Sequence, residues 1–246
     1  MRRTVAGLLL GFCLYWLSAS WVWADRPQLI LIIDDIGNQR QLGERAIALP
    51  GNLTFAVLPG LPWSRYLAEL AHNHSREVML HLPMANHGRL PLGPMGLTED
   101  MDAMQWRDTL QQALAHVEFA QGVNNHMGSL LTENGEAMAV VMSELRAADL
   151  YFIDSLTSPR SLAYQTAQAW QVPALRRHVF LDHEPTLEFV QSQFAQALAM
   201  TEQLGTVVVI GHPYPATLTF LEWVLPLLAE SEVELVTPSE ALHAFQ

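Results

Sequence analysis

The segment 28–37, Gln-Leu-Ile-Leu-Ile-Ile-Asp-Asp-Ile-Gly, places an unbroken aliphatic run directly before two adjacent carboxylates. Such a run is typical of a strand that is buried on both faces, as the strands of parallel sheets are. Comparable short apolar runs, each bounded by polar or turn residues, span residues 53–58, 77–81, 122–124, 151–153, 206–210 and 233–236. We therefore expect about seven buried strands.

Between these runs, apolar residues recur at intervals of three and four, which predicts amphipathic helices. The expected helices span residues 63–73, 106–120, 135–148, 161–170, 186–204 and 217–229. Strands that alternate with helices of this length imply parallel pairing and an α/β fold. Six or seven such units suit a slightly reduced (β/α) barrel, and a doubly wound open sheet is the alternative that periodicity alone does not separate.

One segment breaks this regularity. Residues 82–101 contain three prolines and three glycines, a composition too irregular for a helix or a strand. We expect a long surface loop of the kind that often carries function.

The charge balance excludes some classes of partner. The 246-residue chain has 25 acidic and 13 basic residues, a formal net charge of −12, and every basic residue is an arginine. Nucleic acid and anionic lipid both require a clustered basic surface. We therefore expect neither nucleic acid nor a membrane surface as a partner of the mature protein.

The N-terminal residues 1–24 have the pattern of a signal peptide. They begin with two arginines, run apolar over residues 5–17 and end in Val22-Trp-Ala24. We expect cleavage after Ala24, export to a periplasm, and a single mature domain of residues 25–246; an uncleaved membrane anchor is the alternative. Cleavage also removes Cys13, the only cysteine, so a disulfide or thiolate ligand is not expected.

The polar residues of greatest interest follow buried strands directly. They are Asp34, Asp35, His81, His126, Asp154, Ser155 and His212. The carboxyl ends of parallel strands open onto one face of an α/β fold, so we expect these distant residues to converge there.

A convergent set of this kind suits metal-assisted hydrolysis. One carboxylate and two imidazoles form a facial ligand set for a divalent metal with open positions. Adjacent carboxylates on an extended strand point to opposite sides, so one of Asp34 and Asp35 is expected to bind metal while the other accepts a proton from water. His212 is placed to protonate a leaving group.

Several motifs in order along the chain resemble the divergent polysaccharide deacetylase family, a distant branch of the NodB-like carbohydrate esterases. The resemblance covers nearly all of residues 28–246 and implies a distorted (β/α) barrel of about seven parallel strands. The motifs are Ile-Ile-Asp34-Asp35-Ile-Gly, Thr-Phe-Ala-Val-Leu-Pro, His81-Leu-Pro-Met, Gly-Val-Asn-Asn-His126-Met-Gly-Ser, Phe-Ile-Asp154-Ser155, Arg177-His-Val-Phe-Leu-Asp182 and Ile-Gly-His212-Pro.

The resemblance also implies roles for individual residues. It makes Asp34 the base, Asp35 and His81 metal ligands, and His212 the acid. The second ligand histidine of the main NodB pattern lies four residues after the first, where this chain has Ala85. We therefore expect His126 as the third ligand, with His87 in the irregular loop as the competing candidate.

The remaining candidates are expected to orient catalytic groups or to bind substrate. They are Asn125, Asp154, Ser155, Arg177 and Asp182. For Arg177 and Asp182 the alternative is a structural ion pair.

These observations predict an exported hydrolase that removes acyl groups from amino sugars of a cell-envelope glycan of the peptidoglycan type. Ligand preference favours Zn²⁺ as the metal. The rival hypothesis is a metal-containing protein that binds a glycan or a wall-remodelling protein without turnover. Phosphodiester hydrolysis is disfavoured because the sequence contains no cluster of basic residues that could bind a phosphate.

Overall fold

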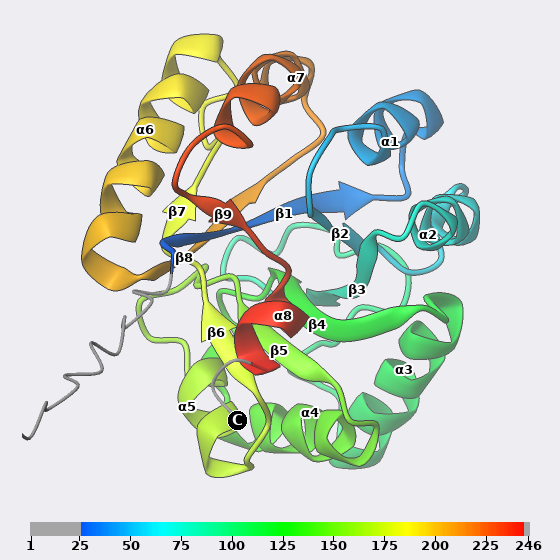
Figure 1. Ribbon diagram of the computed structural model, residues 1–246. Helices are drawn as coiled ribbons and strands as arrows, with labels where there is room; N and C mark the ends of the chain where they lie inside the picture. Colours follow the sequence, from blue (N-terminus) through cyan, green and yellow to red (C-terminus); the bar gives the residue numbers. More distant parts are fainter. Residues whose placement is uncertain (1–25, 244–246) are drawn as a thin grey trace, which may run out of the picture.

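The computed structural model describes residues 26–243 and shows one curved, parallel sheet surrounded by helices (Figure 1). The strand order is β6-β5-β4-β3-β2-β1-β8-β7. The strands are β1 (Gln28–Ile36), β2 (Thr54–Val57), β3 (Glu77–Met84), β4 (Ala120–Met127), β5 (Tyr151–Asp154), β6 (Ala174–Arg176), β7 (Val179–Phe180) and β8 (Thr206–Gly211), and a short β9 (Glu234–Leu235) also pairs with β1.

The sheet curls into an incomplete barrel, which confirms the expected (β/α) fold. Among the described strands, β6 and β7 stand at the two ends of the order, and residues 177–178 join them along the chain. Both are very short, so the barrel stays open at this seam. Residues 177–182 cross this seam, since the Arg177 amide donates to the Asp154 carbonyl at the end of β5 over 2.9 Å and the Leu181 amide donates to the Ile210 carbonyl of β8 over 2.8 Å.

The helices pack around the outside of the sheet (Figure 1). They are α1 (Arg40–Ile47), α2 (Ser64–Asn73), α3 (Ala103–His116), α4 (Gly135–Ala147), α5 (Ala163–Ala169), α6 (Leu187–Leu204), α7 (Pro215–Leu228) and α8 (Pro238–His243), with a 3-10 turn η1 (Leu131–Glu133). Within residues 26–243, no helix is both long and apolar enough to cross a membrane.

The aliphatic run of β1 is buried on both faces, as expected for a strand inside an α/β barrel. Leu29, Leu31 and Ile33 pack into the large core between the sheet and the helices, whereas Ile30 and Ile32 pack into a smaller core inside the curved sheet. This alternation leaves no polar face, which is why the sequence of β1 shows no alternating pattern.

Four short elements, α1, β6, β7 and α8, were not expected from the sequence. Helix α1 is polar for most of its length, and β6 and β7 contain too few residues for a periodic pattern. Helix α8 was also unexpected; it lies at the amino end of the strands, where the Ser239 amide donates to Glu77 Oε1 over 3.3 Å. The start of the expected loop is wrong because β3 continues to Met84, which forms an isolated bridge with Leu97.

Candidate metal centre and catalytic site

Three of the predicted residues converge near the carboxyl ends of β1, β3 and β4, although His81 does not end its strand as expected, because β3 continues for three more residues to Met84. Asp35 Oδ1 lies 3.2 Å from His81 Nε2 and 3.0 Å from His126 Nδ1, and these two ring nitrogens lie 3.1 Å apart. Within the described residues these three form the group of side chains that could share a metal ion. The competing candidate, His87, lies apart from this group and contacts Glu133 at 3.1 Å.

The spacing of the three atoms fits a divalent metal. Zinc bonds of about 2.0–2.1 Å in a tetrahedron separate neighbouring ligand atoms by roughly 3.3 Å, close to all three observed distances. Asp35 Oδ1 is buried and accepts no hydrogen bond from any group in residues 26–243. A buried carboxylate oxygen without such a partner, facing two imidazole nitrogens, has a free lone pair that a bound cation would accept.

The backbone at Asp35 explains how two adjacent aspartates reach the same side of the site. The β1–β2 register shifts between Ile33 and Ile36, and Asp35 has a φ of 58° in the left-handed region. His81 Nε2 therefore lies 3.5 Å from Asp34 Oδ2 as well as 3.2 Å from Asp35 Oδ1. The expectation that the carboxylates point to opposite sides is wrong because it assumed a regular extended strand.

The electrostatic surroundings of the two carboxylates differ. Burial raises the pKa of Asp34 above its ordinary value, although nearby imidazoles oppose the effect. Burial would also raise the pKa of Asp35, but the imidazoles of His126 and His81 hold that pKa well below its usual range. Asp35 is therefore suited to remain an anionic ligand, whereas Asp34 is more suited to accept a proton.

Asn124, which the sequence pattern does not distinguish as a site residue, connects the proposed base Asp34 to the proposed ligand His81. The His81 Nδ1–H donates to Asn124 Oδ1 over 2.7 Å, and Asn124 Nδ2 donates to Asp34 Oδ1 over 2.8 Å. The first bond leaves the His81 Nε2 lone pair directed to the metal position. A fully buried asparagine within a strand is the signal that could have identified it, because such an amide must find partners.

His212 is held by a carboxylate behind it. Asp182 accepts hydrogen bonds from His212 Nδ1 over 2.9 Å, from the His212 amide over 2.6 Å and from Thr217 Oγ1 over 2.8 Å. On the other side of the ring, His212 Nε2 lies 3.8 Å from Asp35 Oδ2. Burial lowers the pKa of His212, but the hydrogen bond and charge of Asp182, together with the charges of Asp34 and Asp35, raise it to about 9. The ring is thus protonated at neutral pH and able to act as an acid.

The other predicted residues build the loop that follows β5. Asn125 Oδ1 accepts from the Ser155 amide over 2.9 Å, and Asp154 accepts from the Leu156 amide over 2.8 Å. Arg177 donates to the carbonyls of Ser155 and Leu156 over 2.7 and 3.0 Å. The ion pair of Arg177 with Asp182 is absent from the described residues, where Asp182 is occupied by His212. Their role in substrate binding stays a prediction.

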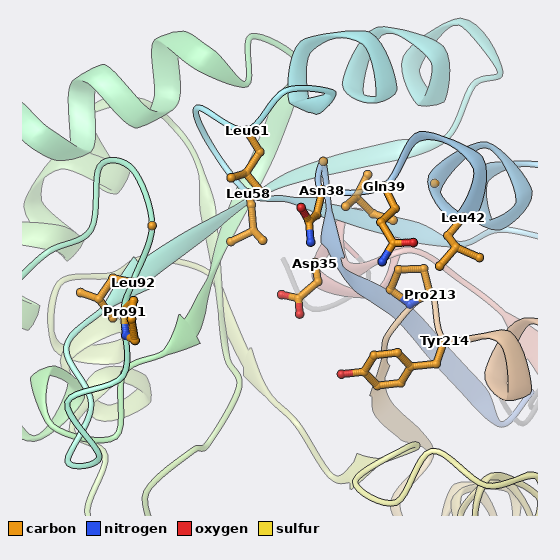
Figure 2. Close-up of a pocket in the computed structure, with 14 residues that line it drawn as sticks. Asp35, Asn38, Gln39, Leu42, Leu58, Leu61, Pro91, Leu92, Pro213 and Tyr214 are labelled. Atoms are coloured by element: carbon orange, nitrogen blue, oxygen red, sulfur yellow. The ribbon is translucent and has the colours of Figure 1, made fainter.

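A cleft of about 370 Å³ opens beside Asp35 (Figure 2). Its walls come from the β1–α1 turn, α1, the β2–α2 turn, the loop after β3 and the β8–α7 turn. Asp35 is the member of the metal triad that lines it, and Figure 2 shows its carboxylate facing the open space. The volume is within the usual range for small-molecule sites.

Comparison with known proteins identifies the family. The divergent polysaccharide deacetylase family matches residues 31–242. The chain is 35% identical over 216 residues to the uncharacterized protein YibQ of Escherichia coli K12, a match that covers 88% of this chain and 67% of YibQ.

Solved structures share the fold at low sequence identity. The uncharacterized protein ATU2773 of Agrobacterium tumefaciens has a TM-score of 0.85 at 20% identity, covering 90% of this chain and 91% of that one. The catalytic domain of a peptidoglycan N-acetylglucosamine deacetylase from Eubacterium rectale has 0.55 at 13%, covering 86% and 88%. BA3943 of Bacillus anthracis, a CE4 family pseudoenzyme, has 0.51 at 14%, covering 89% and 66%. With its family match across most of the chain, this protein belongs to the divergent polysaccharide deacetylase family.

Proposed function

We propose that the protein is an exported, metal-dependent hydrolase that removes acyl groups from amino sugars of a cell-envelope glycan. The observation that carries this proposal is the arrangement of Asp35, His81 and His126 as a three-ligand group, with Asp34 and His212 beside it. Three protein ligands with a base and an acid nearby are the requirements of metal-assisted amide hydrolysis. Zn²⁺ is the proposed metal, and residues 1–24 are the proposed export signal.

The residues divide the chemistry between them. Asp35, His81 and His126 would hold a divalent ion, which when bound would supply Lewis-acid activation of the acyl carbonyl and of the attacking water. Asp34 takes a proton from that water as its oxygen bonds to the carbonyl carbon. His212 then gives a proton to the sugar nitrogen as the carbon–nitrogen bond breaks. The products are a carboxylate and a free amine, with Asp182 holding His212 in place throughout.

The direct test compares the wild type with Asp34→Asn, both loaded with zinc. We expect release of carboxylate from N-acylated chitooligosaccharides or peptidoglycan fragments by the wild type. The variant should retain its metal and lose activity by at least a hundredfold, the scale of a positioned general base. Undiminished activity in the variant would contradict the role of Asp34.

The second candidate is a metal-containing protein that binds a glycan or a wall-remodelling protein without turnover. Two observations favour keeping it: Ala85 occupies the position of the second histidine of the NodB pattern, and a pseudoenzyme shares the fold. Tight glycan or protein binding by the zinc-loaded protein, with no release of carboxylate from any N-acylated glycan, would select this candidate.

A further inference from the structure

The cleft beside Asp35 is lined mainly by aliphatic side chains from separate segments. Leu42 lies on α1, Leu58 and Leu61 lie between β2 and α2, and Leu92 lies on the loop after β3. All four leucines are only partly buried, and Figure 2 shows them around the space that the Asp35 carboxylate faces. Among the described residues that line the cleft, Asp35 alone carries a charge.

We propose that this cleft is an acyl-chain pocket that takes a medium-length aliphatic acyl group from the amino sugar. The proposal rests on the proposed hydrolase function and names the substrate class for that site. A dry apolar cavity of about 150 Å³ is large enough for benzene, which has six carbons. The cleft, at about 370 Å³, therefore has room for a chain of roughly eight carbons. An acetyl methyl group would leave most of the leucine surface in contact with water.

A sugar ring fits this lining less well than an acyl chain. The uncharged polar side chains of the lining, Asn38, Gln39 and Tyr214, are exposed, whereas the leucines are half-buried. Sugar hydroxyls placed against the leucines would lose their hydrogen bonds to water without replacement, which is costly. The polar groups are better placed to contact the part of the ligand that remains near solvent.

The position of Asp35 connects the pocket to the chemistry. Asp35 belongs both to the ligand triad and to the lining of the cleft. An acyl carbonyl at the triad can therefore extend its chain into the cleft while the sugar nitrogen stays outside. Hydrolysis of that amide by water would release a fatty acid as its carboxylate and leave the free amino sugar.

Chain-length preference is the first test. The zinc-loaded protein is assayed with chitobiose carrying N-acetyl, N-butyryl or N-octanoyl groups. Because each buried methylene contributes roughly fourfold in kcat/KM, we expect the octanoyl substrate to exceed the acetyl substrate by at least tenfold. Equal or faster cleavage of the acetyl substrate would contradict the proposal that the cleft binds an acyl chain, but it would still support the hydrolase function. Absence of all cleavage would refute the hydrolase function. The acyl-chain pocket would then be tested by the binding measurement described next.

Binding gives a readout that does not depend on turnover. Calorimetric titration compares N-octanoylglucosamine with N-acetylglucosamine, and we expect at least tenfold tighter binding of the octanoyl sugar. Leu92→Asn should reduce this preference severalfold. Leu90→Asn is the matched control because Leu90 lies on the same loop, is 58% exposed and does not line the cleft. Equal affinity for the two sugars, or equal losses in the two variants, would overturn the proposal.

Discussion

At the scale of single residues, Asn124 contacts two groups that have different tasks in the proposed chemistry. Its amide oxygen fixes the tautomer of the ligand His81, and its amide nitrogen fixes the base Asp34. Groups that orient metal ligands in this way tune both affinity and geometry. The sequence places Asn124 in a strand, but only the structure pairs it with residues from β1 and β3.

The first prediction concerns Asn124→Ala. Loss of the amide should weaken zinc binding by about 10–100-fold, because the His81 ring loses its support. The rate with saturating zinc should fall as well, since Asp34 loses a hydrogen bond. Competition with a chelator of known affinity measures the first effect, and single-turnover hydrolysis measures the second.

Asn124→Asp separates these two contributions. A carboxylate there still accepts from His81 Nδ1 but no longer donates to Asp34, so zinc affinity should persist while the rate falls. If Asn124→Ala kept the zinc affinity and the rate of the wild type, the side chain of Asn124 would contribute only to packing.

The second prediction concerns Asp182→Asn in metal-free protein. Removal of the negative charge should lower the pKa of His212 from about 9 toward its ordinary value of 6.5. NMR titration of the imidazole nitrogens measures this pKa directly. An unchanged pKa would mean that Asp182 does not control the acid.

The same shift predicts the sign of a stability change with pH. A folded-state pKa raised from 6.5 to about 9 stabilises the protein fully below pH 6.5, and this contribution is lost as the pH rises through 9. The free energy of unfolding of metal-free protein, measured with urea, should decline over this range. The decline should be smaller in Asp182→Asn.

At the scale of elements, long periodic segments were predictable and short ones were not. Helix α6 begins after Thr186, whose hydroxyl accepts from the Phe189 amide, and its expected bounds of 186–204 agree closely with the structure. Helix α3 begins earlier than the expected residue 106, because Asp102 and Gln105 form a capping box before the first buried residue of the helix, Trp106. Such caps depend on side-chain hydrogen bonds that hydrophobic periodicity does not detect.

The capping box gives the third prediction. Asp102→Ala should lower the free energy of unfolding by about 1 kcal/mol, because the Gln105 amide loses its acceptor. Asp108→Ala is the matched control, since Asp108 is an exposed residue in the middle of the same helix. Urea unfolding at neutral pH measures both, and an equal effect of the two substitutions would contradict the cap.

At the scale of the whole molecule, strand topology explains why the candidate site was largely predictable. Asp35, His81 and His126 are far apart in sequence, but each lies near the carboxyl end of a strand in a parallel sheet, with Asp35 and His126 one residue before the ends of β1 and β4 and His81 three residues before the end of β3. The rule that such ends share one face was enough to bring them together. What it did not provide was the left-handed backbone at Asp35 or the closeness of Asp182 to His212, because these depend on local geometry and on the seam beside β7.

The most direct test of the central claim, a metal centre built from Asp35, His81 and His126, is the zinc content of matched histidine variants. Wild type, His126→Ala and His87→Ala are equilibrated with zinc, passed through a desalting column and analysed by mass spectrometry for metals. We expect stoichiometric zinc in the wild type and in His87→Ala, and zinc at background level in folded His126→Ala. Unchanged zinc in His126→Ala, or loss of zinc only in His87→Ala, would contradict the proposed centre.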